Sequence, residues 1–135
     1  MAPRYLLDTD TCIYLRQKRP ENVLNRFAKL EIGEAVISVV TYGELFYGVE
    51  KHTQSRLLLD RLAELTALLP VLPLTLETAQ AYGVIRAELE RAGRLIGGND
   101  LWIAAHARAE GLTLVTNNQK EFRRVRGLKL QNWCD

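Results

Sequence analysis

The sequence predicts an α/β fold built on a parallel sheet with helices on both faces. Short apolar runs alternate with amphipathic helical patterns along all 135 residues. Because parallel strands need long crossover connections, which are usually helices, this alternation favours a parallel sheet. We expect a single domain over residues 1–135 with one core, since no internal repeat, linker or low-complexity tract divides the chain.

The expected strands are short apolar runs. Residues 4–7 lead directly to Asp8, and residues 35–40 are rich in β-branched side chains, which favour a strand. Pro70 bounds a third run. The expected strands are 4–7, 35–40, 71–74, 112–115 and 128–130.

The expected helices repeat apolar residues every three or four positions. Residues 20–30 begin with Pro20, which suits a first helical position, and Gly111 is placed to end the last long helix as a C-cap. The expected helices are 11–17, 20–30, 42–51, 54–68, 76–92 and 100–110.

Composition excludes several classes of protein. The apolar fraction of 47% and the charged fraction of 25% are ordinary for a globular chain, and no apolar run approaches the ~20 residues of a membrane span. We therefore expect a cytoplasmic protein without a membrane partner. The net charge of +2 permits nucleic-acid binding without requiring it. Cys12 and Cys134 are expected to be free thiols, and no His or Cys spacing fits zinc, so oxygen atoms would have to hold any metal.

Three acids occupy equivalent places, where an apolar segment meets the start of a helix. Asp8 follows the first strand, Glu44 lies one turn into the helix after the second, and Asp100 follows the turn at 97–99. Ligands of open parallel sheets bind beyond the carboxyl ends of the strands, where the strand order reverses. If the first and fourth strands are neighbours there, the loops after Asp8 and before Asn118 open into one crevice.

Each acid also has a purely structural interpretation. Glu44 completes a capping-box pattern with Thr41, Asp100 suits the positive end of a helix dipole, and Asp8 could anchor the following loop. One shared site would explain all three together. Two carboxylates ~4 Å apart repel by ~4 kcal/mol at an effective dielectric of ~20, so a cluster needs a cation or a proton. Oxygen ligands alone favour Mg²⁺ or Mn²⁺.

Four segments carry a family resemblance: Leu6–Asp10, Thr41–Gly48, Gly98–His106 and Leu114–Phe122. In order and spacing they resemble the PIN-domain ribonucleases, and most closely the VapC toxins of bacterial toxin–antitoxin pairs. The resemblance runs from about Tyr5 to Trp133. It implies a PIN-like three-layer fold with a five-stranded parallel sheet and a Mg²⁺- or Mn²⁺-dependent endoribonuclease. It also implies a VapB-type antitoxin as partner, a homodimer and a toxin–antitoxin hetero-oligomer. Some relatives cut the anticodon region of initiator tRNA.

The resemblance also assigns residues. Asp8, Glu44 and Asp100 match the three acidic metal positions. A fourth acid that is common in the family is replaced by Asn118, so we expect one tightly held ion, with Glu121 able to act through water. Thr116 is expected to position a carboxylate or a water; an ordinary strand-end threonine is the alternative.

Two rival functions remain open, one suggested by Asp10 and the other by Asn118. Leu6–Thr11 also resembles the strand-end motif of haloacid-dehalogenase-type phosphatases, with Asp8 as the nucleophile and Asp10 as the acid/base. Thr116 and Lys120 would stand in for the later motifs of that family. That interpretation leaves Glu44 and Asp100 without a role. The second rival is an RNA-binding module with weak or absent catalysis, which the uncharged Asn118 would fit.

Two surfaces are expected to bind partners. Basic residues gather within 16–19, 86–94 and 120–129, and the last group follows the predicted catalytic loop, which makes it the expected phosphate track if it is more than a solvated face. The apolar and aromatic side chains of Ile13–Leu15 and Tyr42–Val49 are the expected antitoxin surface. The acidic crevice beside them would attract an arginine from that partner.

Overall fold

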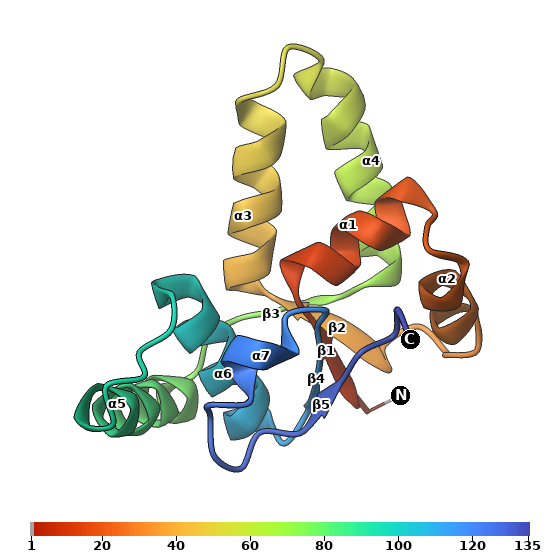
Figure 1. Cartoon of the computed structure of the whole chain (residues 1–135). Coiled ribbons are helices and arrows are strands. Elements are labelled where there is room, and N and C mark those ends of the chain that lie inside the picture. The colour runs from red at the N-terminus through yellow and green to blue at the C-terminus, as the bar shows by residue number, and fades with distance from the viewer. Residues whose placement is uncertain (1) are drawn as a thin grey trace.

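The computed structural model describes residues 2–135, which form a five-stranded parallel sheet between two layers of helices (Figure 1). The strands are β1 (Tyr5–Leu7), β2 (Ala35–Ser38), β3 (Val71–Leu72), β4 (Thr113–Val115) and β5 (Leu130–Gln131). Their order across the sheet is β3-β2-β1-β4-β5, and every neighbouring pair is parallel. The expected α/β class and the parallel sheet are confirmed.

Helices cover both faces of this sheet. α1 to α4 pack on one face, where α3 and α4 form a long hairpin, and α5, α6 and α7 pack on the other (Figure 1). The helices are α1 (Thr9–Gln17), α2 (Glu21–Ala28), α3 (Val39–Glu50), α4 (Ser55–Leu68), α5 (Leu76–Arg91), α6 (Gly98–Glu110) and α7 (Gln119–Phe122). Within residues 2–135, none of these helices has the length and apolar character needed to cross a bilayer.

Most elements begin or end a few residues away from the predicted bounds, and two differences affect the site. The strand expected over 35–40 ends at Ser38, because the Ser38 side chain accepts a hydrogen bond from the Val40 amide (3.1 Å) and starts α3 there. The β-branched pair Val39 and Val40 had favoured a longer strand. The short helix α7 was not expected at all, because four residues are too few to show a helical period.

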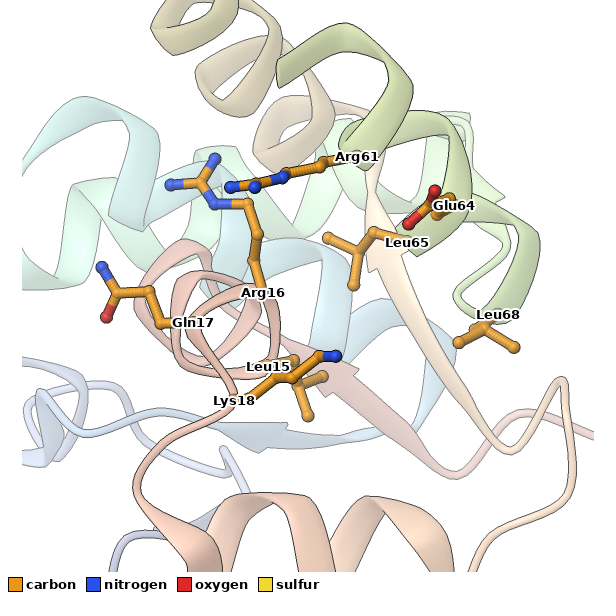
Figure 2. A pocket seen from close by; sticks show the side chains of 8 residues that line it. All are labelled: Leu15, Arg16, Gln17, Lys18, Arg61, Glu64, Leu65 and Leu68. Atoms are coloured by element: carbon orange, nitrogen blue, oxygen red, sulfur yellow. The ribbon is translucent and has the colours of Figure 1, made fainter. Parts of the chain in front are cut away.

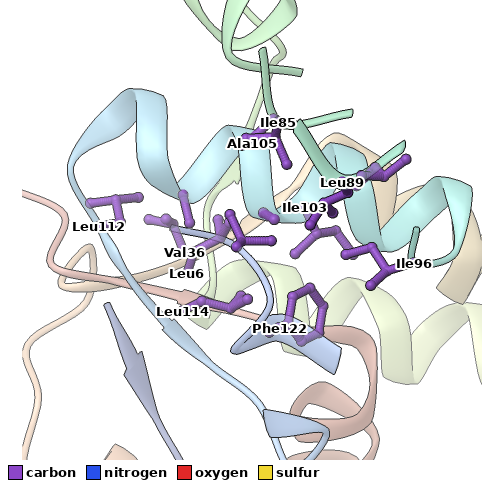
Figure 3. Packing of buried hydrophobic residues seen from close by; sticks show 14 residues of the cluster. Leu6, Val36, Ile85, Leu89, Ile96, Ile103, Ala105, Leu112, Leu114 and Phe122 are labelled. Atoms are coloured by element: carbon purple, nitrogen blue, oxygen red, sulfur yellow. The ribbon is translucent and has the colours of Figure 1, made fainter. Parts of the chain in front are cut away.

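Alternating side chains of the central strands build two cores. Leu6 and Leu114 point to the side of α5 and α6, while Leu7 and Val115 point to the side of α1 and α3. Figure 3 shows the first of these cores, in which Phe122 of α7 packs with Leu6 and Leu114. Because α7 is fixed to this core, the residues just before it have a defined position.

The strand order reverses between β1 and β4, as the sequence interpretation required. Leu7 pairs with Val115, and one residue further the Asp8 amide donates to the Val115 carbonyl (3.0 Å). Asp8 and Thr116 therefore leave adjacent strands at the same edge of the sheet. This edge is where a ligand of an open parallel sheet is expected.

Candidate functional site

Asp8 is the most constrained of the three predicted acids. It is the N-cap of α1, and its Oδ1 accepts a hydrogen bond from the Thr11 amide (2.9 Å). Its Oδ2 accepts a hydrogen bond from the Thr116 hydroxyl on the neighbouring strand end. Only 5% of Asp8 is exposed, and this burial raises the pKa of the carboxyl group, while the hydrogen bonds from Thr116 and Thr11 oppose the rise. The side chain is therefore held in one orientation by two elements.

Glu44 reaches the same edge from α3. It is half-buried, and its Oε1 accepts a hydrogen bond from the hydroxyl of Thr9 (3.1 Å), the residue after Asp8. The capping-box interpretation of Glu44 is wrong, because Ser38 caps α3 and Thr41 lies buried within the helix. Glu44 is free of a local capping role and is oriented instead by the start of α1.

Asp100 comes from the first turn of α6 and is half-buried. Its pKa is raised to about 6, first by burial, then by the neighbouring carboxylate of Glu121, and further by Glu44 and Asp8. Mutual repulsion among these groups is the electrostatic sign that the acids lie close together. A proton or a bound cation would therefore reduce the repulsion between these carboxylates.

The acids line one hollow of about 170 Å³ at the carboxyl edge of the sheet. Four of its lining residues are carboxylates, and none is cationic. Across residues 2–135, no group of three or more His, Cys, Asp or Glu side chains is arranged as a ready metal-ligand set. The carboxylates instead surround a shared space that also has room for water molecules. The lining residues are Asp8, Thr9, Asp10, Glu44, Asp100, Ile103, Asn118 and Phe122.

The remaining predicted residues surround this hollow in different ways. The Thr116 hydroxyl that donates to Asp8 also accepts a hydrogen bond from the Asn118 amide (2.9 Å). Asn118 lines the hollow and directly precedes α7. Glu121 is not among the lining residues, but it is near enough to raise the pKa of Asp100.

Sequence reasoning missed the residues that orient and wall the site. The Thr9 hydroxyl pairs with a carboxylate 35 positions away, a contact for which the sequence carries no signal. Ile103 and Phe122 form apolar walls of the hollow. Ile103 follows Asp100 by one helical turn, so the helical period could have indicated that the two share a face.

Asp10 is exposed and lines the hollow beside Asp8, whose pKa it raises only as the least of five causes. Lys120, which the phosphatase interpretation would use, is exposed and is not among the lining residues. Glu44 and Asp100, which that interpretation leaves unused, do line the hollow. The geometry therefore favours the three-acid interpretation.

A second hollow of about 500 Å³ lies between α1 and α4, on the side where an antitoxin was expected (Figure 2). Its apolar part is formed by Leu15, Leu65 and Leu68, and Arg16 and Arg61 extend along one side. Of the aromatic side chains expected on the partner surface, Tyr47 is 65% exposed, whereas Tyr42 and Phe46 are half-buried.

Comparison with known proteins identifies relatives over nearly the whole chain. The profile of the PIN domain family matches residues 5–128. The chain is 42% identical over 130 residues to Ribonuclease VapC2 of Haemophilus influenzae, covering 96% of this chain and 98% of the relative. It is 39% identical over 131 residues to the tRNA(fMet)-specific endonuclease VapC of Salmonella typhimurium, covering 97% and 98%. The structure of DNA-bound VapBC from Salmonella typhimurium superposes with a TM-score of 0.92 at 39% identity, covering 98% of this chain and 99% of that one.

Proposed function

The chain belongs to the VapC family of PIN-domain ribonucleases, and we propose that it cleaves RNA as an endonuclease at the acidic hollow beyond β1. The observation that carries the proposal is the meeting of Asp8, Glu44 and Asp100 from three separate elements around one space. If each acid had only a local structural role, the three would not need to lie around one space. A site that hydrolyses a phosphodiester does need its acids close together.

The three acids would hold one Mg²⁺ ion, for which Mn²⁺ can substitute. Carboxylate oxygens without imidazole or thiolate ligands suit these hard cations, and the raised pKa of Asp100 indicates a shortage of positive charge at the site. When bound, the ion supplies Lewis-acid polarisation of a phosphoryl oxygen and activation of a water. Asn118 supplies no charge, and Glu121, three residues further on, could act through a water.

The protein's own residues fix the geometry for this reaction. Thr116 and Thr11 hold the two oxygens of Asp8, and Thr9 orients Glu44. Asp100, with a pKa of about 6, is partly protonated near neutral pH and would lose that proton when a cation binds. Cation affinity is therefore expected to fall as the pH drops through about 6.

The substrate we propose is cytoplasmic RNA, and the anticodon region of initiator tRNA is the first candidate. The relative from Salmonella typhimurium, which is named a tRNA(fMet)-specific endonuclease, supports this choice. The phosphatase alternative predicts cleavage of small phosphomonoesters instead, and the non-catalytic alternative predicts RNA binding without cleavage.

We also propose that a VapB-type antitoxin inhibits the enzyme by docking along α1, α3 and the hollow lined by α4. Solved relatives are VapBC complexes, and Leu68 of the α1–α4 hollow and Tyr47 of α3 are exposed apolar side chains that a partner would cover. The exposed apolar side chains Leu76 and Val84 of α5 offer a second surface, for a homodimer within the toxin–antitoxin hetero-oligomer.

The test is cleavage of initiator tRNA by purified protein with Mg²⁺ and with EDTA. Asp8→Asn removes the most constrained carboxylate and should abolish cleavage, while Asp60→Asn, on the exposed side of α4, is the matched control and should cleave as the unmodified protein does. Cleavage by Asp8→Asn at the rate of the unmodified protein, or cleavage that persists in EDTA, would overturn the proposal.

A further inference from the structure

A basic groove, separate from the acidic hollow, is formed where the end of α5 meets the segment that follows α7. Its volume is about 450 Å³, and it runs between the C-terminal turns of α5 and the segment after α7. Two basic groups that are separate in the sequence meet here, 86–94 and 120–129. The groove is lined by four arginines, Arg91, Arg94, Arg124 and Arg126, by one acid, Glu88, and by the small or apolar residues Ile85, Leu89, Ala92 and Val125.

The positive charge of this groove is not neutralised by ion pairs. Within residues 2–135 the salt bridges are Arg4–Glu34 and Arg86–Glu90, and neither involves a groove arginine. Four guanidinium groups thus face a single carboxylate. Since the chain carries 18 basic and 16 acidic residues in total, this groove concentrates more positive charge than the chain average provides.

Arg124 has a structural role in the groove, because its guanidinium group binds the protein backbone. The Nη1 of Arg124 donates to the carbonyl oxygens of Arg94 (3.5 Å) and Leu95 (3.1 Å). This ties the segment after α5 to the segment after α7. Arg91, Arg94 and Arg126 are exposed, so their guanidinium groups are accessible to a ligand.

The groove is joined to the acidic hollow through shared structure. Phe122 walls the hollow, and Val125, one turn further, lines the groove. Both belong to the same core as Ile96, which in the sequence follows the groove residue Arg94 and precedes the acid Asp100. Figure 3 shows Phe122 and Ile96 in this core. The hollow and the groove are therefore walled by residues of the same packed core.

The charge of the acidic hollow explains why an RNA substrate would need a basic surface elsewhere on the protein. The four carboxylates of the hollow repel a polyanion, so affinity for RNA has to come from positive charge outside the hollow. Guanidinium groups bind phosphate oxygens with paired, planar hydrogen bonds. We propose that the groove of Arg91, Arg94 and Arg126 binds phosphates of the RNA on one side of the cleaved linkage. This proposal rests on the proposed ribonuclease function.

The test measures binding without cleavage. The probe is a fluorescent stem–loop RNA with 2′-O-methyl groups, in EDTA, with binding followed by anisotropy at salt concentrations between roughly 50 and 200 mM. The variant carries Arg91→Gln, Arg94→Gln and Arg126→Gln. The matched control, Arg19→Gln, Lys29→Gln and Arg56→Gln, removes the same charge from exposed positions of the opposite helical layer.

The groove variant should bind more weakly, and the slope of log K against log salt should become shallower by about 2 to 3, or roughly 0.7–0.9 for each lost phosphate contact. The control should keep the slope of the unmodified protein. If the groove variant does not fold, Arg91→Gln and Arg126→Gln are measured singly, each with an expected change of roughly 0.7–0.9.

An equal loss of slope in both variants would overturn the groove proposal, because it would indicate a general charge effect. Unchanged RNA binding in the groove variant would overturn it as well, because the arginines would then make no contact with the phosphates. These outcomes are independent of catalysis. If the unmodified protein bound RNA through the groove but never cleaved it, the ribonuclease proposal would fail and the groove would stand.

Discussion

Replacing Asp100 by asparagine should make the metal-free protein more stable at neutral pH, although it removes a site residue. The pKa of Asp100 is about 6 in the folded protein, against an ordinary value of 3.8. An acid whose pKa is raised by folding costs stability above its folded pKa, and this cost disappears as the pH falls below the unfolded value. The cost is therefore complete above about pH 6 and largely absent near pH 4.

The size of the effect follows from the shift. About two pKa units at 1.36 kcal/mol each give about 3 kcal/mol, which half-exposure of Asp100 and solvent screening reduce to about 1–2 kcal/mol. For a chain of this length, that corresponds to a rise in Tm of roughly 3–8 °C. The asparagine cannot ionise, so the gain should shrink as the pH approaches 4.

The assay is urea and thermal unfolding of both proteins in EDTA at pH 7.5 and at pH 4. Asp60→Asn is the matched control, because it makes the same chemical change at an exposed position of α4 and should leave stability nearly unchanged at both pH values. A loss of stability at pH 7.5 in Asp100→Asn, or an equal gain at both pH values, would refute the idea that crowded carboxylates destabilise the site.

Three further predictions concern Thr116, which supports Asp8, the neighbouring acid Asp10, and inhibition by an antitoxin. Thr116→Val should lower the free energy of unfolding by about 2 kcal/mol, because it removes the hydroxyl that donates to Asp8. Thr116→Ser keeps a hydroxyl and should retain most of this stability; an equal loss of stability in both variants would disprove the role of the hydroxyl. Asp10→Asn should reduce RNA cleavage far less than Asp8→Asn; a loss of comparable depth, within the roughly 10²–10⁴ of a general acid/base, would instead favour the phosphatase interpretation. Expression of the chain alone should arrest growth, and co-expression with the neighbouring small reading frame should restore it; normal growth with soluble protein alone would remove the toxin claim but not the nuclease claim.

The sequence predicted the framework of the site better than its details. Asp8, Glu44 and Asp100 could be found because each lies where a recognisable element ends or begins, and parallel strands bring their carboxyl ends to one edge. The start of α3 could not be found in the same way, since Val39 and Val40 favour a strand and the deciding contact is a single serine cap. Local pattern therefore gives elements, but not every boundary.

Contacts between residues far apart in the chain could not be predicted from local sequence patterns. The hydrogen bond from Thr9 to Glu44 and the approach of Glu121 to Asp100 depend on how α1, α3, α6 and α7 pack, not on the composition of any one of them. The capping-box pattern at Thr41 predicted the wrong helix start, because Ser38, three residues earlier, caps α3. The basic groove is the same kind of case, because its arginines come from two segments that only the fold brings together.

The most direct test of a shared cation site is a calorimetric titration of Mg²⁺ and Mn²⁺ into the purified protein and into Asp8→Asn, Glu44→Gln and Asp100→Asn. We expect one ion bound per chain, much weaker binding in each of the three variants, unchanged binding in Asp60→Asn, and affinity that falls as the pH drops through about 6. Binding of comparable strength in all three site variants, or no binding by the unmodified protein, would contradict the claim that these acids form one cation site.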